Sequence, residues 1–389
     1  MGEARRGQPT DDRVPDPDGT ADLISVAVYG ATGHSGRQVA SRLVELGGPV
    51  VLVGRNRDKL AAVQADLDGA VSIRVGPLDD PRALRRAFDG CAAVVACAGP
   101  FARYGEPVVQ AAIDARVHYL DISGEQAYIS RIFDRYGSAA EQAGIAIVPA
   151  VGIDSIPAEM LAPLAAEGLG SLQSLTVVID VRGGRTNTGS LLTLLDCAHR
   201  REGLRFVDGA FQPAPRQLRG GRWDLASGER VSLMRFAGAE TVLLPRHLDT
   251  AGVKVFFTAG SALPGWVPGA VGLAAMRLAE GLARTPAYPV LRPLLTRLPA
   301  PRRDIERISV EVEARSVDGK TRGACLTAPG AYWFTSVAAA QAAAWAAAPG
   351  FDRSGPLTPA QAFPPIDFLD GLVGLGATYR VGLLDAPPS

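Results

Sequence analysis

The 389-residue chain has 47% hydrophobic and 21% charged residues, a composition typical of a soluble globular protein long enough for two domains. Its 40 basic and 40 acidic residues give a formal net charge of zero, so the chain lacks the positive field that holds nucleic acid or an anionic membrane. We therefore expect no nucleic-acid partner.

The cysteines and histidines indicate neither a metal site nor a disulfide framework. The four cysteines are scattered without CxxC spacing, and the four histidines form no HExxH motif. Residues 1–22 are polar and proline-containing, and they lack the apolar core of a signal peptide. We expect a flexible tail over these residues, no metal, and a cytoplasmic location.

The first predicted strand, 24–29, runs directly into a glycine-paced turn and a predicted helix at 35–46. The spacing is GxxGxxG, in which Gly30 permits a tight turn, Gly33 lets the backbone approach a phosphate, and Gly36 lets the helix lie close to the strand. The N–H groups at the start of the helix would then face the pyrophosphate of a dinucleotide. The predicted phosphate-binding residues are Gly30, Ala31, Thr32, Gly33, His34, Ser35 and Gly36.

The second predicted strand, 50–53, ends about 20 residues past the glycines, where dinucleotide-binding domains recognise the ribose. An NAD site would place an acid at that position, but Gly54 and Arg55 follow this strand. A guanidinium can pair with a 2′-phosphate, so the pattern predicts NADP(H). Lys59 is either a second phosphate ligand or part of a solvated helix face, and Asn56 fits the N-cap of the next helix.

Strand and helix patterns alternate as far as residue 150, which predicts βαβ units and a doubly wound parallel sheet. The further strands are predicted at 71–75, 92–97, 117–122 and 145–149, and the helices at 57–67, 81–89, 105–115 and 126–143. The loops that follow the strands should face the cofactor. Asp79 would meet the adenine end or cap a helix, whereas Cys97, Ala98, Gly99, Pro100 and Phe101 would run beside the nicotinamide, with the last two as walls.

Three side chains in these loops are candidate proton donors. Tyr104 follows the nicotinamide loop and is the leading candidate, with a packing role at the domain hinge as its alternative. Asp154 and Asp121 are the second choices, since each carboxyl group could equally cap or stabilise a turn. Near Asp121, Ser123 and Glu125 suit a helix start and His118 suits the core.

Beyond residue 150 the pattern becomes rich in consecutive strands, which predicts an α+β domain built on a mixed or antiparallel sheet. Strands are predicted at 174–181, 230–236, 240–244, 252–258 and 305–315, the last continuing into a hairpin at Asp318-Gly319. Helices are predicted at 188–200 and 335–348, and surface connections at 213–222 and 284–304. The apolar segment 256–283 is too interrupted by proline and glycine to span a membrane, so it is a buried loop and helix, a lid over a hydrophobic substrate, or a lipid-contacting surface.

Several blocks together resemble the saccharopine dehydrogenase-like NADP-binding family, in particular its trans-acting enoyl reductase branch. They are GATGxxG at 30–36, GR at 54–55, CAGPFxxYG at 97–105, HYxDxSGE at 118–125 and GIDSIP at 152–157. Further similar blocks are Gly183-Gly184 with Thr188-Gly189-Ser190, PGAY at 329–332 and LTPA at 357–360. The first of these blocks is either an anchor for the substrate or a solvated loop.

This resemblance implies a Rossmann domain at 23–150, a substrate domain at 151–348, and a segment at 349–389 that returns to the first domain. It also implies hydride transfer from NADPH to an activated double bond of a small molecule. We favour the enoyl C=C bond of a hydrophobic or acyl metabolite such as a thioester; the alternatives are an imine reductase and a non-catalytic dinucleotide-binding scaffold. A homodimer and lipid contact through 256–283 are further partner hypotheses.

A short-chain dehydrogenase mechanism is excluded, because it requires a tyrosine four residues before a lysine. The three lysines, Lys59, Lys254 and Lys320, have no tyrosine at that position.

Overall fold

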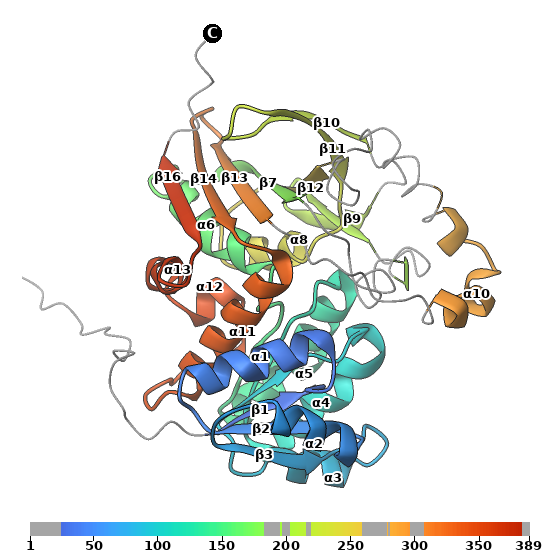
Figure 1. Cartoon of the computed structure of the whole chain (residues 1–389). Helices are drawn as coiled ribbons and strands as arrows, with labels where there is room; N and C mark the ends of the chain where they lie inside the picture. The colour runs from blue at the N-terminus through green and yellow to red at the C-terminus, as the bar shows by residue number, and fades with distance from the viewer. Residues whose placement is uncertain are drawn as a thin grey trace, which may run out of the picture.

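The computed structural model describes residues 25–182, 195–196, 203–214, 219–258, 278, 281–295 and 307–382. The expected amino-terminal tail, most of the 188–200 helix, most of the apolar 256–283 segment and the Gly183 to Ser190 block lie outside the described residues. Within the described part, the chain forms two lobes, each built on its own sheet (Figure 1).

The first lobe holds a parallel sheet whose strand order is β15-β6-β5-β4-β1-β2-β3. The order 3-2-1-4-5-6 is that of the doubly wound dinucleotide-binding fold, so the predicted Rossmann-like sheet is confirmed. The strands are β1 (Val26–Tyr29), β2 (Val50–Gly54), β3 (Val71–Val75), β4 (Ala93–Ala96), β5 (His118–Asp121), β6 (Ala146–Val148) and β15 (Gly355–Pro356).

Helices cover both faces of this sheet, which explains why its strands are continuous apolar runs. In β1, Val26 and Val28 pack in one core with α1 and α2, whereas Ala27 and Tyr29 pack in another with α3, α4 and α5. The helices are α1 (His34–Glu45), α2 (Arg57–Ala65), α3 (Pro81–Phe88), α4 (Phe101–Ala115) and α5 (Gln126–Ala143).

The second lobe holds a mixed sheet, as predicted, in the order β10-β11-β12-β7-β13-β14-β16, with β8 and β9 attached through β12. Only β7 and β12 pair in parallel among the described strands of this sheet. The strands are β7 (Leu172–Arg182), β8 (Leu204–Val207), β9 (Ala210–Pro213), β10 (Arg219–Asp224), β11 (Arg230–Arg235), β12 (Gly252–Thr258), β13 (Arg307–Ser316), β14 (Thr321–Ala328) and β16 (Thr378–Gly382).

Three predicted segments of this lobe differ from the structure. Residues 240–244 were expected as a strand but form α8 (Glu240–Leu243) and a 3-10 turn, Leu244–Arg246, because a short apolar run does not distinguish a strand from a buried helical turn. The expected connection at 213–222 contains part of β10, whose two glycines and bulge mask its strand pattern. The expected connection at 284–304 contains α10 (Tyr288–Leu295).

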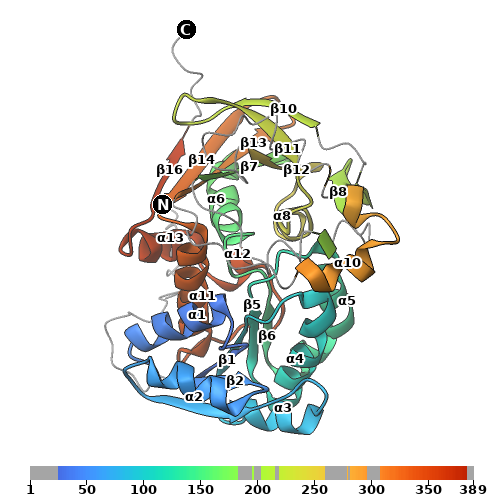
Figure 2. The same ribbon diagram turned by 45° about the vertical axis from the view of Figure 1, so that its right-hand side comes forward.

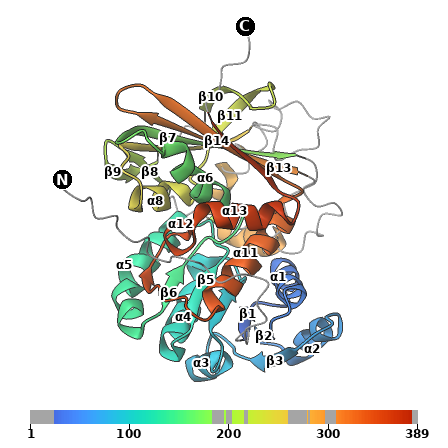
Figure 3. The same ribbon diagram turned by 90° about the vertical axis from the view of Figure 1, so that its left-hand side faces the viewer.

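The carboxy-terminal part of the chain crosses between the lobes (Figures 2 and 3). Helix α11 (Ala331–Ala347), within the range expected for the substrate domain, packs against α1 and β4 of the first lobe. Strand β15 then extends the first sheet, α12 (Pro359–Ala362) and α13 (Pro365–Val373) pack on α6 (Ile156–Ala166), and β16 joins the second sheet. The two lobes are therefore tied together by several chain passages.

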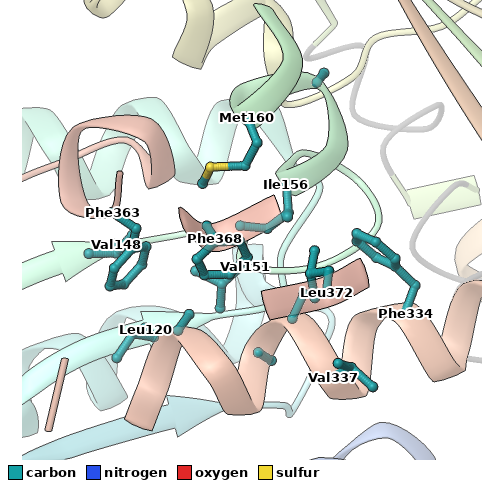
Figure 4. Close-up of a cluster of buried hydrophobic side chains, with 14 of the residues drawn as sticks. Leu120, Val148, Val151, Ile156, Met160, Phe334, Val337, Phe363, Phe368 and Leu372 are labelled. Atoms are coloured by element: carbon teal, nitrogen blue, oxygen red, sulfur yellow. The ribbon is translucent and has the colours of Figure 1, made fainter. Parts of the chain in front are cut away.

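A continuous hydrophobic core joins the lobes where these passages meet. Figure 4 shows side chains from β5, β6, α6, α11 and the α12–α13 region packed together: Leu120, Val148, Val151, Ile156, Met160, Phe334, Val337, Phe363, Phe368 and Leu372. Phe368 is fully buried and packs against Trp345 and Phe363, with ring centroids 5.3 and 5.6 Å away. The junction is thus a packed interior and holds the lobes in a defined relation.

None of the described helices is long and apolar enough to cross a membrane.

We predict that Phe368→Ala will lower the free energy of unfolding by about 3–5 kcal/mol, because it removes a buried ring and leaves a cavity. Ile366→Ala is the matched control two residues away, since Ile366 is 52% exposed, and it should cost about 0.5 kcal/mol or less. Urea denaturation of both variants measures the difference. Equal losses would show that α13 does not contribute to the shared core.

Candidate dinucleotide-binding and active site

The glycine turn between β1 and α1 is packed so closely that side chains are excluded at two positions. Gly30 has a φ of +81°, and a Cβ there would lie 2.9 Å from the Cβ of Ala98. A Cβ on Gly36 would lie 2.3 Å from the carbonyl oxygen of Gly30. The helix therefore begins directly against the turn, with the geometry that dinucleotide-binding turns require.

The start of α1 is open to an anion. Its N-cap residue, Gly33, is exposed and has no side chain to bond the first amides of the helix. Ala31 is buried beneath the turn, the carbonyl oxygen of Thr32 accepts from Arg37 Nε, and Ser35 is partly exposed. The exposed end of α1 thus fits a pyrophosphate group.

The second strand ends with Arg55 at the surface, and Lys59 is exposed one turn into α2. Among the described residues, no carboxylate forms an ion pair with the Arg55 guanidinium. Asn56 caps α2 through its side-chain oxygen, 2.9 Å from the Lys59 amide, as predicted.

Asp79 lies close enough to the end of β1 to act electrostatically on the Tyr29 side chain, as Arg55 does. Burial raises the pKa of Tyr29, at the end of β1, to about 12; Arg55 opposes this rise and Asp79 adds to it. The helix-capping role considered for Asp79 belongs instead to Asp80, whose Oδ1 accepts from the Ala83 amide at 2.9 Å. Asp79 is exposed and stays a candidate for the adenine end.

The loop after β4 runs along the glycine turn. The Cys97 amide donates to the Tyr29 carbonyl at 2.8 Å, and Ala98 contacts Gly30. Burial, with the nearby Asp121 charge, strongly raises the pKa of the Cys97 thiol, so the thiol is not a reactive thiolate. Gly99 is exposed and Pro100 is partly buried at the N-cap of α4.

The location of the Phe101 ring differs from the one predicted for it, which was a wall of the nicotinamide site. Phe101 is only 6% exposed and packs on Tyr128, with ring centroids 5.7 Å apart. The ring therefore supports the loop from the core side.

Glu125 stabilises the start of α4. Its carboxylate accepts from the Phe101 amide at 2.6 Å and from the Ala102 amide at 2.8 Å, across 24 and 23 residues of sequence. A negative charge at a helix N-terminus is favourable, so this end of α4 already holds its anion. Sequence reasoning placed Glu125 at the start of the following helix and missed this contact.

Asp121, at the end of β5, is fully buried and bonded on both carboxylate oxygens. Oδ1 accepts from the Ser123 amide and hydroxyl and from the Ala150 amide, and Oδ2 accepts from the Tyr119 hydroxyl. Burial raises its pKa, and these hydrogen bonds oppose the rise. The structure favours the positioning role that was weighed for Asp121 over proton donation. His118 is likewise structural, because its Nδ1 accepts from the Ala146 amide at 3.0 Å.

Tyr104 and Asp154 are the two candidate donors that reach the surface of the site region. Tyr104 is partly exposed in the first turn of α4, and the Arg103 guanidinium lies 5.2 Å from its ring centroid. Asp154 is partly exposed in the loop between β6 and α6. Burial raises the pKa of Asp154 to about 6, so its carboxyl group exchanges protons near neutral pH.

Two residues of the second half reach this region without having been predicted to do so. Tyr332, at the start of α11, makes a T-shaped contact with His34 at a centroid distance of 5.0 Å. Glu240, in α8, interacts electrostatically with Asp154. The PGAY block was a sequence signal for Tyr332, but Glu240 lay in a segment read as a strand.

Within the described ranges, no three His, Cys, Asp or Glu side chains are arranged to hold a metal ion.

We predict that Gly36→Ala will weaken NAD(P)H binding and lower the melting temperature, because the new methyl group must displace the Gly30 carbonyl at a cost of about 1–3 kcal/mol. Gly281→Ala, where a Cβ meets open space, is the control and should change neither. Fluorescence titration with NADPH and thermal melts provide the two readouts. Unchanged binding in Gly36→Ala would mean that the turn does not hold the cofactor.

Comparison with known proteins supports this assignment of the first lobe. A family model described as NAD(P)H-binding matches residues 30–131. A protein of Arabidopsis thaliana named as a mitochondrial saccharopine dehydrogenase-like oxidoreductase is 34% identical over 152 residues, which cover 36% of this chain and 34% of that protein. A trans-acting enoyl reductase of Mycobacterium ulcerans is 32% identical over 142 residues, covering 35% and 34% respectively. These matches therefore span about a third of each relative.

The fold comparison extends over nearly the whole chain. Apo saccharopine dehydrogenase (L-Glu forming) of Saccharomyces cerevisiae is 13% identical, with a TM-score of 0.59 over 92% of this chain and 99% of that one. The two proteins thus share the arrangement of a Rossmann lobe and a mixed-sheet lobe. The chain thus has an NAD(P)-binding Rossmann domain, and it is similar to saccharopine dehydrogenase-like oxidoreductases and trans-acting enoyl reductases over about a third of their length.

Proposed function

We propose that this protein is an NADPH-dependent oxidoreductase that reduces an activated double bond, with the enoyl C=C bond of a hydrophobic or acyl metabolite as the favoured substrate. The observation that carries the proposal is the pairing of an open, glycine-built helix start with an exposed arginine at the end of β2. The first binds a pyrophosphate, and the second binds an additional phosphate on the ribose.

The preference for NADPH over NADH rests on the charges at the end of β2. Gly54 is buried and leaves space, and Arg55 is exposed without a carboxylate partner among the described residues. The position lacks the acid that would accept from an unphosphorylated 2′-hydroxyl. A 2′-phosphate would place two negative charges beside this guanidinium.

The chain supplies the proton that accompanies reduction and the geometry that places the substrate. When bound, the reduced nicotinamide supplies a hydride to an electron-poor carbon. Tyr104 is the proposed proton donor, since this partly exposed tyrosine lies on the helix that begins at the nicotinamide loop. The packed junction between the lobes keeps this helix and the second sheet in a constant relation.

The enoyl assignment draws on the sequence blocks and on the relative named as a trans-acting enoyl reductase. A panel of enoyl thioesters and cyclic imines, scored by the loss of NADPH absorbance, tests it directly. Oxidation with thioesters supports the proposal, and oxidation with imines alone would assign the protein as an imine reductase. Binding of NADPH without turnover on either class would favour a dinucleotide-binding scaffold.

We predict that Arg55→Asp will weaken NADPH binding about 100-fold and leave NADH binding nearly unchanged, because it replaces a charged hydrogen-bond donor to the 2′-phosphate with a repelling carboxylate. Arg57→Asp makes the same charge change two residues away and should affect both cofactors little. Calorimetric titration of each variant measures the two affinities. Equal weakening of NADPH and NADH in Arg55→Asp would show that the specificity assignment is wrong.

We predict that Tyr104→Phe will lower kcat by about 100-fold or more and leave NADPH affinity intact, because it removes a proton donor and no cofactor contact. Tyr379→Phe removes a hydroxyl group that bonds Asp370 in the second lobe, so it controls for the loss of a phenol. Steady-state rates on the best substrate of the panel provide the test. An unchanged rate would exclude Tyr104 from the reaction.

A further inference from the structure

The first turn of α11, in the carboxy-terminal part of the chain, lies against the start of α1. Figures 1 and 2 show the two helices side by side, and their residues are in contact. The Tyr332 ring meets the His34 imidazole in a T-shaped contact, with ring centroids 5.0 Å apart and an interplanar angle of 86°. His34 is the first residue of α1 and follows the N-cap Gly33. A side chain that follows β14 of the second sheet therefore stands next to the helix start that fits a pyrophosphate.

The same end of α11 is also fixed on the loop between β6 and α6. The hydroxyl oxygen of Thr335, three residues after Tyr332, accepts from the Ile153 amide at 3.2 Å. A Cβ on Gly152 would lie 3.1 Å from Cγ2 of Thr335. The loops after β1 and β6 both leave the carboxyl ends of parallel strands, which is the edge where a dinucleotide binds. The start of α11 is thus attached to this edge at two places.

The His34 imidazole is restrained from two directions. Besides the Tyr332 ring, the side-chain amide nitrogen of Gln38, one turn further along α1, lies 3.4 Å from His34 Nε2. His34 is exposed and Tyr332 is partly exposed, so a ligand at the helix start can reach the pair. A surface side chain that is ordered before its ligand arrives loses less conformational entropy on binding. The arrangement therefore prepares the imidazole to contact a ligand.

Resting on the proposed function, we propose that Tyr332 is a positioning residue of the dinucleotide site. It holds the His34 imidazole beside the first amides of α1, where the imidazole contacts the pyrophosphate. An N–H group of the ring would add a side-chain donor to the backbone amides of the helix start. Tyr332 lies outside residues 30–131, the part of the chain that matches the NAD(P)H-binding family model. The carboxy-terminal part of the chain would thereby complete a cofactor site that the first lobe begins.

Calorimetric titration of the complete chain with NADPH and NADH tests this role. Tyr332→Ala should weaken the binding of both cofactors by about 10-fold, because both carry the pyrophosphate. Tyr332→Phe keeps the ring and should stay within about twofold of the wild type. Tyr379→Ala removes another partly exposed tyrosine, on β16, and should leave both affinities unchanged. Wild-type binding by Tyr332→Ala, or equal losses in Tyr332→Ala and Tyr332→Phe, would overturn the proposal.

A second probe separates the pyrophosphate from the rest of the cofactor. Adenosine 2′-monophosphate carries the ribose 2′-phosphate but no pyrophosphate, so Tyr332→Ala should leave its affinity unchanged. Arg55→Asp should show the opposite pattern, with a loss for this nucleotide and none for NADH. A parallel loss of adenosine 2′-monophosphate binding in Tyr332→Ala would show that the variant disturbs the first lobe as a whole, and would overturn the assignment to the pyrophosphate.

A double-mutant cycle decides whether Tyr332 acts through His34. His34→Ala should weaken both cofactors by about 10-fold, and the double variant should bind no more weakly than His34→Ala alone, because Tyr332 then has no imidazole to position. Additive losses would overturn the positioning role. If the wild type binds neither dinucleotide, the proposed function fails as well. If the wild type binds a dinucleotide and Tyr332→Ala binds it equally well, the positioning role alone fails.

Discussion

The candidate site depends on the buried carboxylate of Asp121. Through Ser123 and Ala150, and through its own carbonyl oxygen bonded by the Val151 amide, it joins the ends of β5 and β6 at the edge of the first sheet. Ala150 is held in a left-handed conformation with a φ of +61°, which alanine rarely adopts. The loops that carry Glu125 and Asp154 therefore leave the sheet in directions set by this one group.

The buried acids of the protein show how hydrogen bonding decides the state of a carboxyl group. Asp121 and Glu125 are each bonded by backbone amides, which offset the cost of burying a negative charge. Glu240 is equally buried, no side chain among the described residues bonds its carboxyl group, and burial together with Asp154 and Glu159 raises its pKa well above the ordinary value. Similar burial thus accompanies stabilised loops at Asp121 and Glu125 and a raised pKa at Glu240.

The shared core explains how two sheets can form one site. Helices α6, α11 and α13 pack between them, so Tyr332 contacts His34 and α8 contacts α5 and α6. Gln126 reinforces this junction, since its side chain accepts from the Leu204 amide and donates to the Gly238 carbonyl, and thereby links α5 to the second lobe beside Glu240. Much of the interior at this junction is alanine, which allows the helices to approach the first sheet closely.

Local chemistry alone determined much of the first lobe. The glycine turn, the alternation of buried strands and amphipathic helices, and the Asn56 cap each involve groups within a few residues, so the sequence predicts them directly. Tertiary structure decided the contacts that depend on long-range packing. The Glu125 carboxylate binds the first amides of α4, although Glu125 itself stands at the start of α5. Phe101 packs into the core, and residues 240–244 form a helical turn. These outcomes depend on neighbours brought together across the fold, and a local pattern carries no information about which distant surface a side chain will meet.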